Sequence, residues 1–142
     1  MRFLLNDIDW LGGPRAAINS LINFGGISLT TTFLVDTGSP FTIISENDLK
    51  KTRLAYTKCE HYQRIIIGTP MDLKKLGEAQ IIFKDETGNS VPFSHPVYVG
   101  IIVNRNQELI KRLSLSFLGK DFLDKYNLCI TKKDETGQRR ME

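Results

Sequence analysis

The chain has 142 residues, of which 41% are hydrophobic and 25% charged, as is usual for a globular domain with a real core. The formal net charge is only +3, part of it from segment 132–142, so no nucleic-acid-binding patch is indicated. The first residues do not resemble a signal peptide, and no apolar run approaches the roughly 20 residues that span a bilayer. We therefore expect neither a nucleic-acid nor a membrane partner.

Apolar segments and turn residues alternate from the N-terminus onward. Residues 1–15 are an apolar arm that ends near two glycines and a proline. Segment 16–24 predicts a strand, and Gly25-Gly26 predicts the tip of a hairpin. From 27 to 35 apolar and polar residues alternate, which indicates a half-buried strand.

The middle of the chain continues this pattern with one helix signal. A serine followed by acidic residues predicts a short helix over 46–52. Alternation over 77–84 predicts a strand, and 85–89 predicts a turn. Segment 91–103 is apolar and β-branched but contains two prolines, so we expect an edge strand or a bulge there.

The C-terminal third is more polar. Segment 104–112 looks like an insertion that forms a helical turn or a loop, and 120–126 suits a second short helix. Segment 128–131 predicts a last strand, followed by a polar tail over 132–142. Short strands separated by turns predict an all-β barrel or sandwich, with one domain over 16–131.

The two cysteines, Cys59 and Cys129, lie far apart in the sequence. Without a secretory signal, we expect two free thiols in a reducing cytoplasm. Cys59 and His61 are close together, but no second pair of ligands follows at the spacing of a zinc site. One pair cannot complete a four-ligand shell, so we expect no metal, and nothing indicates a cofactor.

The most informative motif is Asp36-Thr37-Gly38-Ser39, because it joins two apolar strands. A carboxylate in that position is costly unless it is hydrogen-bonded or takes part in chemistry. Here two hydroxyls and a glycine N–H follow it directly. The simpler interpretation is a plain turn between two strands, since turns favour the same residue types.

The motif suits peptide hydrolysis. Two carboxylates that share one proton can act together, one as a base on water and the other as an acid on the leaving nitrogen. We expect the Gly38 N–H to bond Asp36, the Ser39 hydroxyl to bond its outer oxygen, and Thr37 to bond across to a second loop. Only one such loop occurs in the sequence, so the second carboxylate has to come from elsewhere.

Between this motif and the C-terminus, segment 62–70 predicts a hairpin that closes over a bound peptide. Backbone groups at its expected tip, Ile67, Gly68 and Thr69, could bond an extended substrate strand. The simpler interpretation is a core strand and a turn.

A further motif is Phe117-Leu118-Gly119, which precedes a predicted helix. Read alone, it is a common strand-to-helix junction. Together with the Asp36 loop and the hairpin, however, it makes the chain resemble the retropepsin-like family of aspartic proteases over about 16–131. The resemblance implies a strand that threads behind the catalytic loop in a ψ-shaped arrangement, with the glycine where two backbones nearly touch.

The resemblance also implies an activity and an assembly. It implies an aspartic endopeptidase that acts as a homodimer on peptides or unfolded proteins, with Asp36 from each chain in a shared active site. In that family Thr37 would lock the two chains together, and Gly38 and Ser39 would support the carboxylate.

Two other functions remain open. A dimeric peptide-binding module could keep the fold without turnover, because the predicted hairpin has only Gly68 near its tip. The pattern Asp36-x-Gly38-Ser39-x-x-Thr42 also fits the phosphate-binding hairpin of sugar kinases and chaperone-type ATPases. Those proteins need a second domain, and 142 residues cannot hold both.

Overall fold

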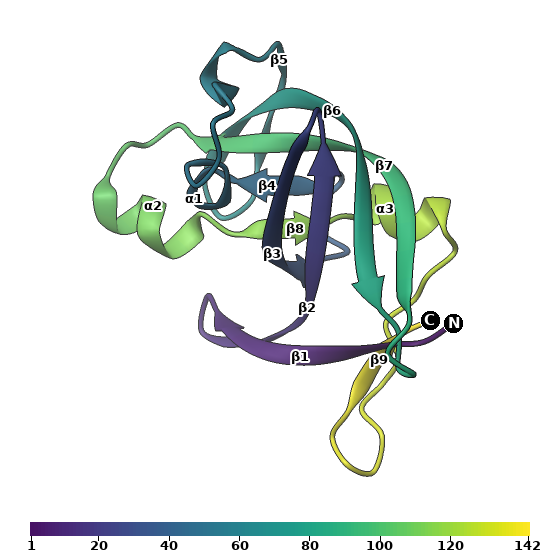
Figure 1. Ribbon diagram of the computed structural model, residues 1–142. Coiled ribbons are helices and arrows are strands. Elements are labelled where there is room, and N and C mark those ends of the chain that lie inside the picture. The colour runs from purple at the N-terminus through teal and green to yellow at the C-terminus, as the bar shows by residue number, and fades with distance from the viewer.

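The computed structural model describes all 142 residues and contains one curved, nine-stranded sheet with three short α-helices. Figure 1 shows the two chain ends side by side at one edge of the molecule. The elements in chain order are β1 (Phe3–Trp10), β2 (Gly13–Phe24), β3 (Ile27–Val35), β4 (Ile43–Ser45), α1 (Glu46–Leu49), the 3₁₀ turn η1 (Tyr56–Lys58), β5 (His61–Ile66), β6 (Pro70–Lys84), β7 (Ser90–Ile102), α2 (Gln107–Leu113), β8 (Ser116–Leu118), α3 (Lys120–Lys125) and β9 (Arg139–Met141).

The sheet closes on itself. Its strands follow the order β5-β6-β7-β4-β8-β3-β2-β1-β9, and β2 pairs in addition with β6. That extra pairing completes a ring from β6 through β7, β4, β8, β3 and β2. Figure 1 shows the long β6–β7 hairpin curving beside β2 and β3. The predicted all-β class is confirmed.

Two apolar clusters fill the interior. The larger contains phenylalanines from several strands and α3, whose rings meet mainly edge to face, as aromatic rings prefer. The smaller lies among β3, β4, β7, β8, α2 and the β5–β6 hairpin. Its buried members are Leu34, Ile43, Ile67, Met71, Leu73, Tyr98, Ile102, Ile110, Leu113 and Phe117.

The predicted helices are present and short. In α1 the Ser45 hydroxyl accepts the backbone N–H of Asp48 at 3.1 Å, as a helix N-cap does, and the helix ends at Leu49. Helix α3 occupies most of the predicted 120–126. The segment 104–112, expected as a helical turn or a loop, contains most of α2, which is capped by the Asn106 side chain. No helix of the protein has both the length and the apolar character needed to cross a membrane.

Strand β7 contains two prolines, and both lie where the strand has only one hydrogen-bonded neighbour. Pro92 and Pro96 lie in its first half, where the strand pairs only with β6. The second half also pairs with β4, at Tyr98 to Gly100. Because proline has no N–H to donate, both prolines lie where one side of the strand has no ladder to complete. This first half is therefore the expected edge, and the expected bulge lies on the partner strand, between Lys75 and Gly77.

Both chain ends belong to the sheet, which differs from the expected apolar arm and polar tail. The arm forms β1, paired with β2 and β9, and the segment 132–142 forms a turn and β9. Met141 is completely buried in the main core. The strand expected over 128–131 is reduced to one bridge, between Ile130 and Met141.

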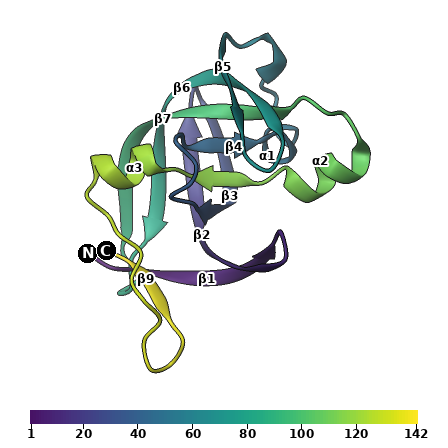
Figure 2. The same cartoon turned by 180° about the vertical axis from the view of Figure 1, so that it is seen from behind.

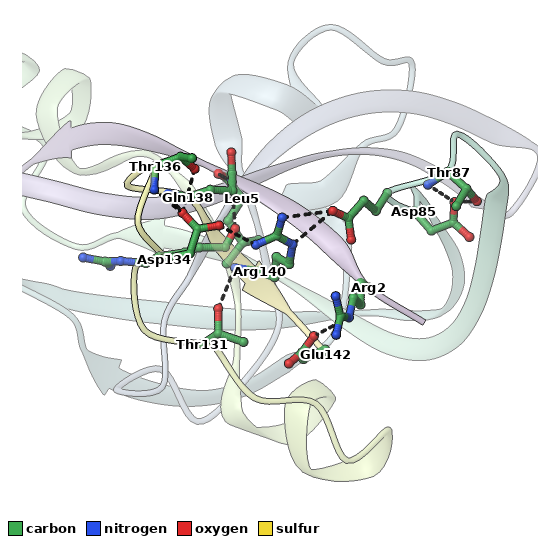
Figure 3. A network of polar contacts seen from close by, with 12 residues as sticks. Arg2, Leu5, Asp85, Thr87, Thr131, Asp134, Thr136, Gln138, Arg140 and Glu142 are labelled. Carbon is green, nitrogen blue, oxygen red and sulfur yellow. Dashed lines mark hydrogen bonds and ion pairs between the residues drawn. The ribbon is translucent and has the colours of Figure 1, made fainter.

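The C-terminal hairpin is fixed by a repeated turn and one arginine. Residues 133–137 repeat the sequence of 84–88, and in both turns the aspartate accepts hydrogen bonds from the threonine N–H and hydroxyl. Arg140 lies between the two turns, bonding Asp134 at 2.8 Å and Glu86 at 3.0 Å (Figure 3). The polar segment 132–142 is therefore held in place by specific tertiary contacts of Arg140.

Candidate active site

The Asp36 loop begins directly after β3 and is held by backbone hydrogen bonds. The N–H of Asp36 donates to the carbonyl of Leu118 at 3.0 Å, and the N–H of Ser39 donates to the carbonyl of Asp36 at 3.1 Å. The N–H of Gly38 donates to Oδ1 of Asp36 at 2.8 Å, as the sequence predicts. The carboxylate is half-buried, and Thr37 and Gly38 beside it are exposed.

Strand β8 threads between the two strands that flank this loop. It runs parallel to β3, with Leu34 opposite Phe117 and Val35 opposite Leu118. It is also antiparallel to β4, with Ile43 opposite Phe117. The expected ψ-shaped arrangement is therefore present, and it fixes the chain on both sides of Asp36.

Gly119 lies where two backbones nearly touch. A Cβ atom at this position would lie 2.3 Å from the carbonyl oxygen of Phe41, far inside normal contact distance. The N–H of Gly119 donates to the Thr42 hydroxyl at 3.2 Å, and the N–H of Lys120 donates to the carbonyl of Ser39 at 2.8 Å. The glycine thus lets the strand behind the loop bond directly to the loop's exit.

Asp121 anchors the same exit, a role that the sequence analysis did not predict. Its carboxylate accepts the Thr42 hydroxyl at 2.9 Å and the Thr42 N–H at 3.2 Å, and its Oδ2 lies 2.9 Å from Nε2 of the buried His95. Burial raises the pKa of Asp121, but hydrogen bonds from His95 and Thr42 outweigh it and the pKa lies below its usual value. An acidic residue in the first turn of a predicted helix was the only sequence signal.

The Ser39 hydroxyl does not make the hydrogen bond to Asp36 that the sequence predicts. The Ser39 hydroxyl donates to the carbonyl of Phe41 at 2.7 Å rather than to the carboxylate of Asp36. Ser39 is completely buried, so its hydroxyl needs a partner within the loop. In the single chain, Ser39 therefore stabilises the turn after Asp36.

The expected hairpin is formed by β5 and β6, with Ile67, Gly68 and Thr69 at its tip. Gly68 has φ +69°, and the N–H of Ile67 donates to the carbonyl of Thr69 at 3.1 Å. Figure 2 shows the hairpin hanging over β4 and β8 with its tip toward α2. Ile67 is 8% exposed, whereas the neighbouring Ile66 is 77% exposed. The tip therefore points one isoleucine into the protein and one into solvent.

Beneath the hairpin lies an apolar floor, defined here as Leu34, Ile43 and Phe117. These residues come from the three strands around the Asp36 loop and share one cluster with Ile67. A surface hollow of about 770 Å³ lies elsewhere, over β2 and β3, and does not include Asp36.

No protein-family model matches the sequence, and no curated protein matches it. Among solved structures, the chain is similar to a retropepsin-like aspartic protease from Rickettsia conorii, with a TM-score of 0.58 and 16% sequence identity. The match covers 99% of this chain and 90% of that one. The chain therefore has the retropepsin-like all-β fold.

Proposed function

We propose that the protein is an aspartic endopeptidase that acts as a homodimer. The observation that carries the proposal is the Asp36 loop, which the ψ-shaped crossing holds rigidly while Thr37 and Gly38 remain exposed. A second copy of the same loop can meet this exposed edge across a two-fold axis, because such an interface is self-complementary. The Asp36 carboxylates of the two chains then become neighbours.

The paired carboxylates supply the chemistry. Two such groups about 3 Å apart cannot both ionise, so they share one proton and titrate as a unit. The ionised carboxylate removes a proton from a bound water, and the oxygen of that water attacks the peptide carbonyl carbon. The protonated carboxyl then gives its proton to the leaving nitrogen as the C–N bond breaks. Gly38 keeps each carboxylate oriented through its N–H.

Substrate binding follows from the hairpin and the floor. Backbone groups at Ile67, Gly68 and Thr69 suit hydrogen bonds to an extended peptide, in the manner of an added strand. The floor is entirely apolar, which favours apolar side chains near the cleaved bond. We accordingly propose peptides or unfolded proteins as substrates, without a nucleic-acid or membrane partner. Both cysteines are free, which suits a cytoplasmic location.

The decisive experiment compares Asp36→Asn with the wild-type protein on a peptide library, with cleavage read by mass spectrometry between pH 3 and 8. We expect Asp36→Asn to abolish cleavage while circular dichroism stays unchanged, because the half-buried side chain keeps its size. Asp124→Asn is the matched control, since that carboxylate is exposed on α3. Cleavage by Asp36→Asn at the wild-type rate would contradict the assignment.

A second function, a peptide-binding module without turnover, is favoured by one observation. The hairpin tip covers the floor in the single chain, and Ile67 is buried there. If wild-type protein binds unfolded peptides yet cleaves none across the same pH range, this second function replaces the first.

A further inference from the structure

The tip of the β5–β6 hairpin lies close to two leucines from other parts of its own chain. A Cβ atom built on Gly68 would lie 3.6 Å from Cδ1 of Leu11 and 3.7 Å from Cδ2 of Leu113. Leu11 lies in the turn between β1 and β2, and Leu113 is the last residue of α2. Three segments that are distant in the sequence therefore meet at the tip.

Trp10 ties two of these segments together. Its Nε1–H donates to the carbonyl of Arg112 at 3.3 Å, which connects the β1–β2 turn to the end of α2. Its ring packs against Phe117 of the floor, with ring centroids 5.4 Å apart and an interplanar angle of 67°. Trp10 is the only tryptophan in the chain.

We propose that Trp10, Leu11 and Leu113 form a latch that keeps the hairpin closed until an extended apolar peptide displaces its tip. The inference rests on the proposed function, because it concerns access to the same site. The floor residues Leu34, Ile43 and Phe117 are at most 2% exposed in the single chain. Ile67 belongs to the same apolar cluster, so we infer that a peptide side chain reaches these residues only after the tip has moved. When the tip moves, the apolar side chain of Ile67 leaves the floor. An apolar side chain of the peptide is the best replacement, because it keeps the floor away from water.

The first test needs no substrate and measures hydrogen–deuterium exchange of the tip amides, 66–71. Leu11→Ala truncates one side chain of the proposed latch, which is 45% exposed, so the fold should tolerate it. We expect exchange at the tip to rise about tenfold, since removing latch contacts increases the open population. Ile66→Ala is the matched control on the same hairpin, because that side chain points into solvent, and its exchange should equal wild type.

Leu113→Ala truncates the second leucine of the proposed latch, which is 3% exposed and shares an apolar cluster with Ile67. Leu123→Ala in α3 is its control, because Leu123 is similarly buried but belongs to the other apolar cluster. We expect faster tip exchange in Leu113→Ala and not in Leu123→Ala. Wild-type exchange at the tip in both Leu11→Ala and Leu113→Ala would overturn the latch.

The second test uses Trp10 fluorescence in Asp36→Asn protein. The probe is a hexapeptide with two central phenylalanines joined by a reduced, uncleavable amide bond. We expect binding to shift Trp10 emission to longer wavelength, and Leu11→Ala to tighten binding about threefold to tenfold, because less of the protein is closed. Absence of binding, or binding without a change in emission, would overturn displacement by peptide. Failure of the proposed function is seen separately, in the cleavage assay, because the exchange measurement requires no turnover.

Discussion

At the scale of single residues, Gly119 shows how one side-chain atom would disturb the site. Its backbone is not in the left-handed region, with φ −88°, so the need for glycine is steric. We expect Gly119→Ala to lower the free energy of unfolding by about 3 kcal/mol, the upper end for an overpacked core, because the new methyl group would overlap the Phe41 carbonyl. Urea unfolding followed by circular dichroism measures this change.

Gly13→Ala is the control for that substitution. A Cβ atom there would meet only the end of the flexible Arg15 side chain, at 3.1 Å. Its unfolding midpoint should remain close to wild type. If Gly119→Ala unfolds at the same urea concentration as Gly13→Ala, the close approach of the two backbones has no energetic consequence.

Residue types predicted the Asp36 loop better than they predicted its hydrogen bonds. The N–H of Gly38 reaches Asp36 because the two groups are local and the turn alone brings them together. The Ser39 hydroxyl bonds the carbonyl of Phe41 instead of Asp36, and that outcome depends on how the loop turns after position 40. Such an outcome is set by tertiary geometry, which a local motif does not encode.

At the scale of elements, the network around Asp121 joins α3, β7 and the exit of the Asp36 loop. The folded pKa of Asp121 lies below its usual value of 3.8, so its ionised form stabilises the fold. This stabilisation is present above about pH 4 and is lost as the pH falls through the lower, folded pKa. We expect Asp121→Asn to lower the free energy of unfolding by about 2 kcal/mol at pH 6, because it removes charged hydrogen bonds.

The test is urea unfolding of both proteins between pH 6 and pH 2, at one protein concentration. The difference between wild type and Asp121→Asn should shrink as the pH falls below 4. Asp124→Asn lies on the same helix with an exposed side chain and should show no comparable loss at pH 6. A difference that is constant with pH would mean that the charge of Asp121 does not contribute.

At the scale of the whole molecule, periodicity predicted the strands and their class but not all their partners. The alternation over 27–35 is local, and β3 lies there with Leu29 and Phe33 buried. Strand β9 pairs with β1 and carries Arg140, which bonds two turns far apart in the sequence. Segment 132–142 was predicted as a tail because its composition is polar, and composition does not report such long-range ion pairs.

The assembly itself is the last prediction at this scale. One chain supplies one Asp36 loop and the proposed chemistry uses two, so we expect a dimer, and Thr37 is exposed on the edge where the loops would meet. We expect Thr37→Val to weaken that dimer by about 2 kcal/mol, since two symmetric hydrogen bonds are lost at about 1 kcal/mol each. That corresponds to a dissociation constant about 30-fold higher.

Sedimentation equilibrium over a dilution series measures the dissociation constant, and cleavage at the same concentrations tests whether activity follows the dimer. Thr30→Val is the matched control, because Thr30 is exposed on β3 and lies before the loop. We expect it to dimerise like wild type. Full cleavage at concentrations where only monomer sediments would exclude a shared pair of carboxylates, whereas a Thr37→Val dimer as tight as wild type would remove Thr37 from the contact. Cleavage by monomer would bear on the proposed chemistry, whereas an unchanged Thr37→Val dimer would bear only on the interface. The two measurements therefore test the shared active site and the role of Thr37 separately.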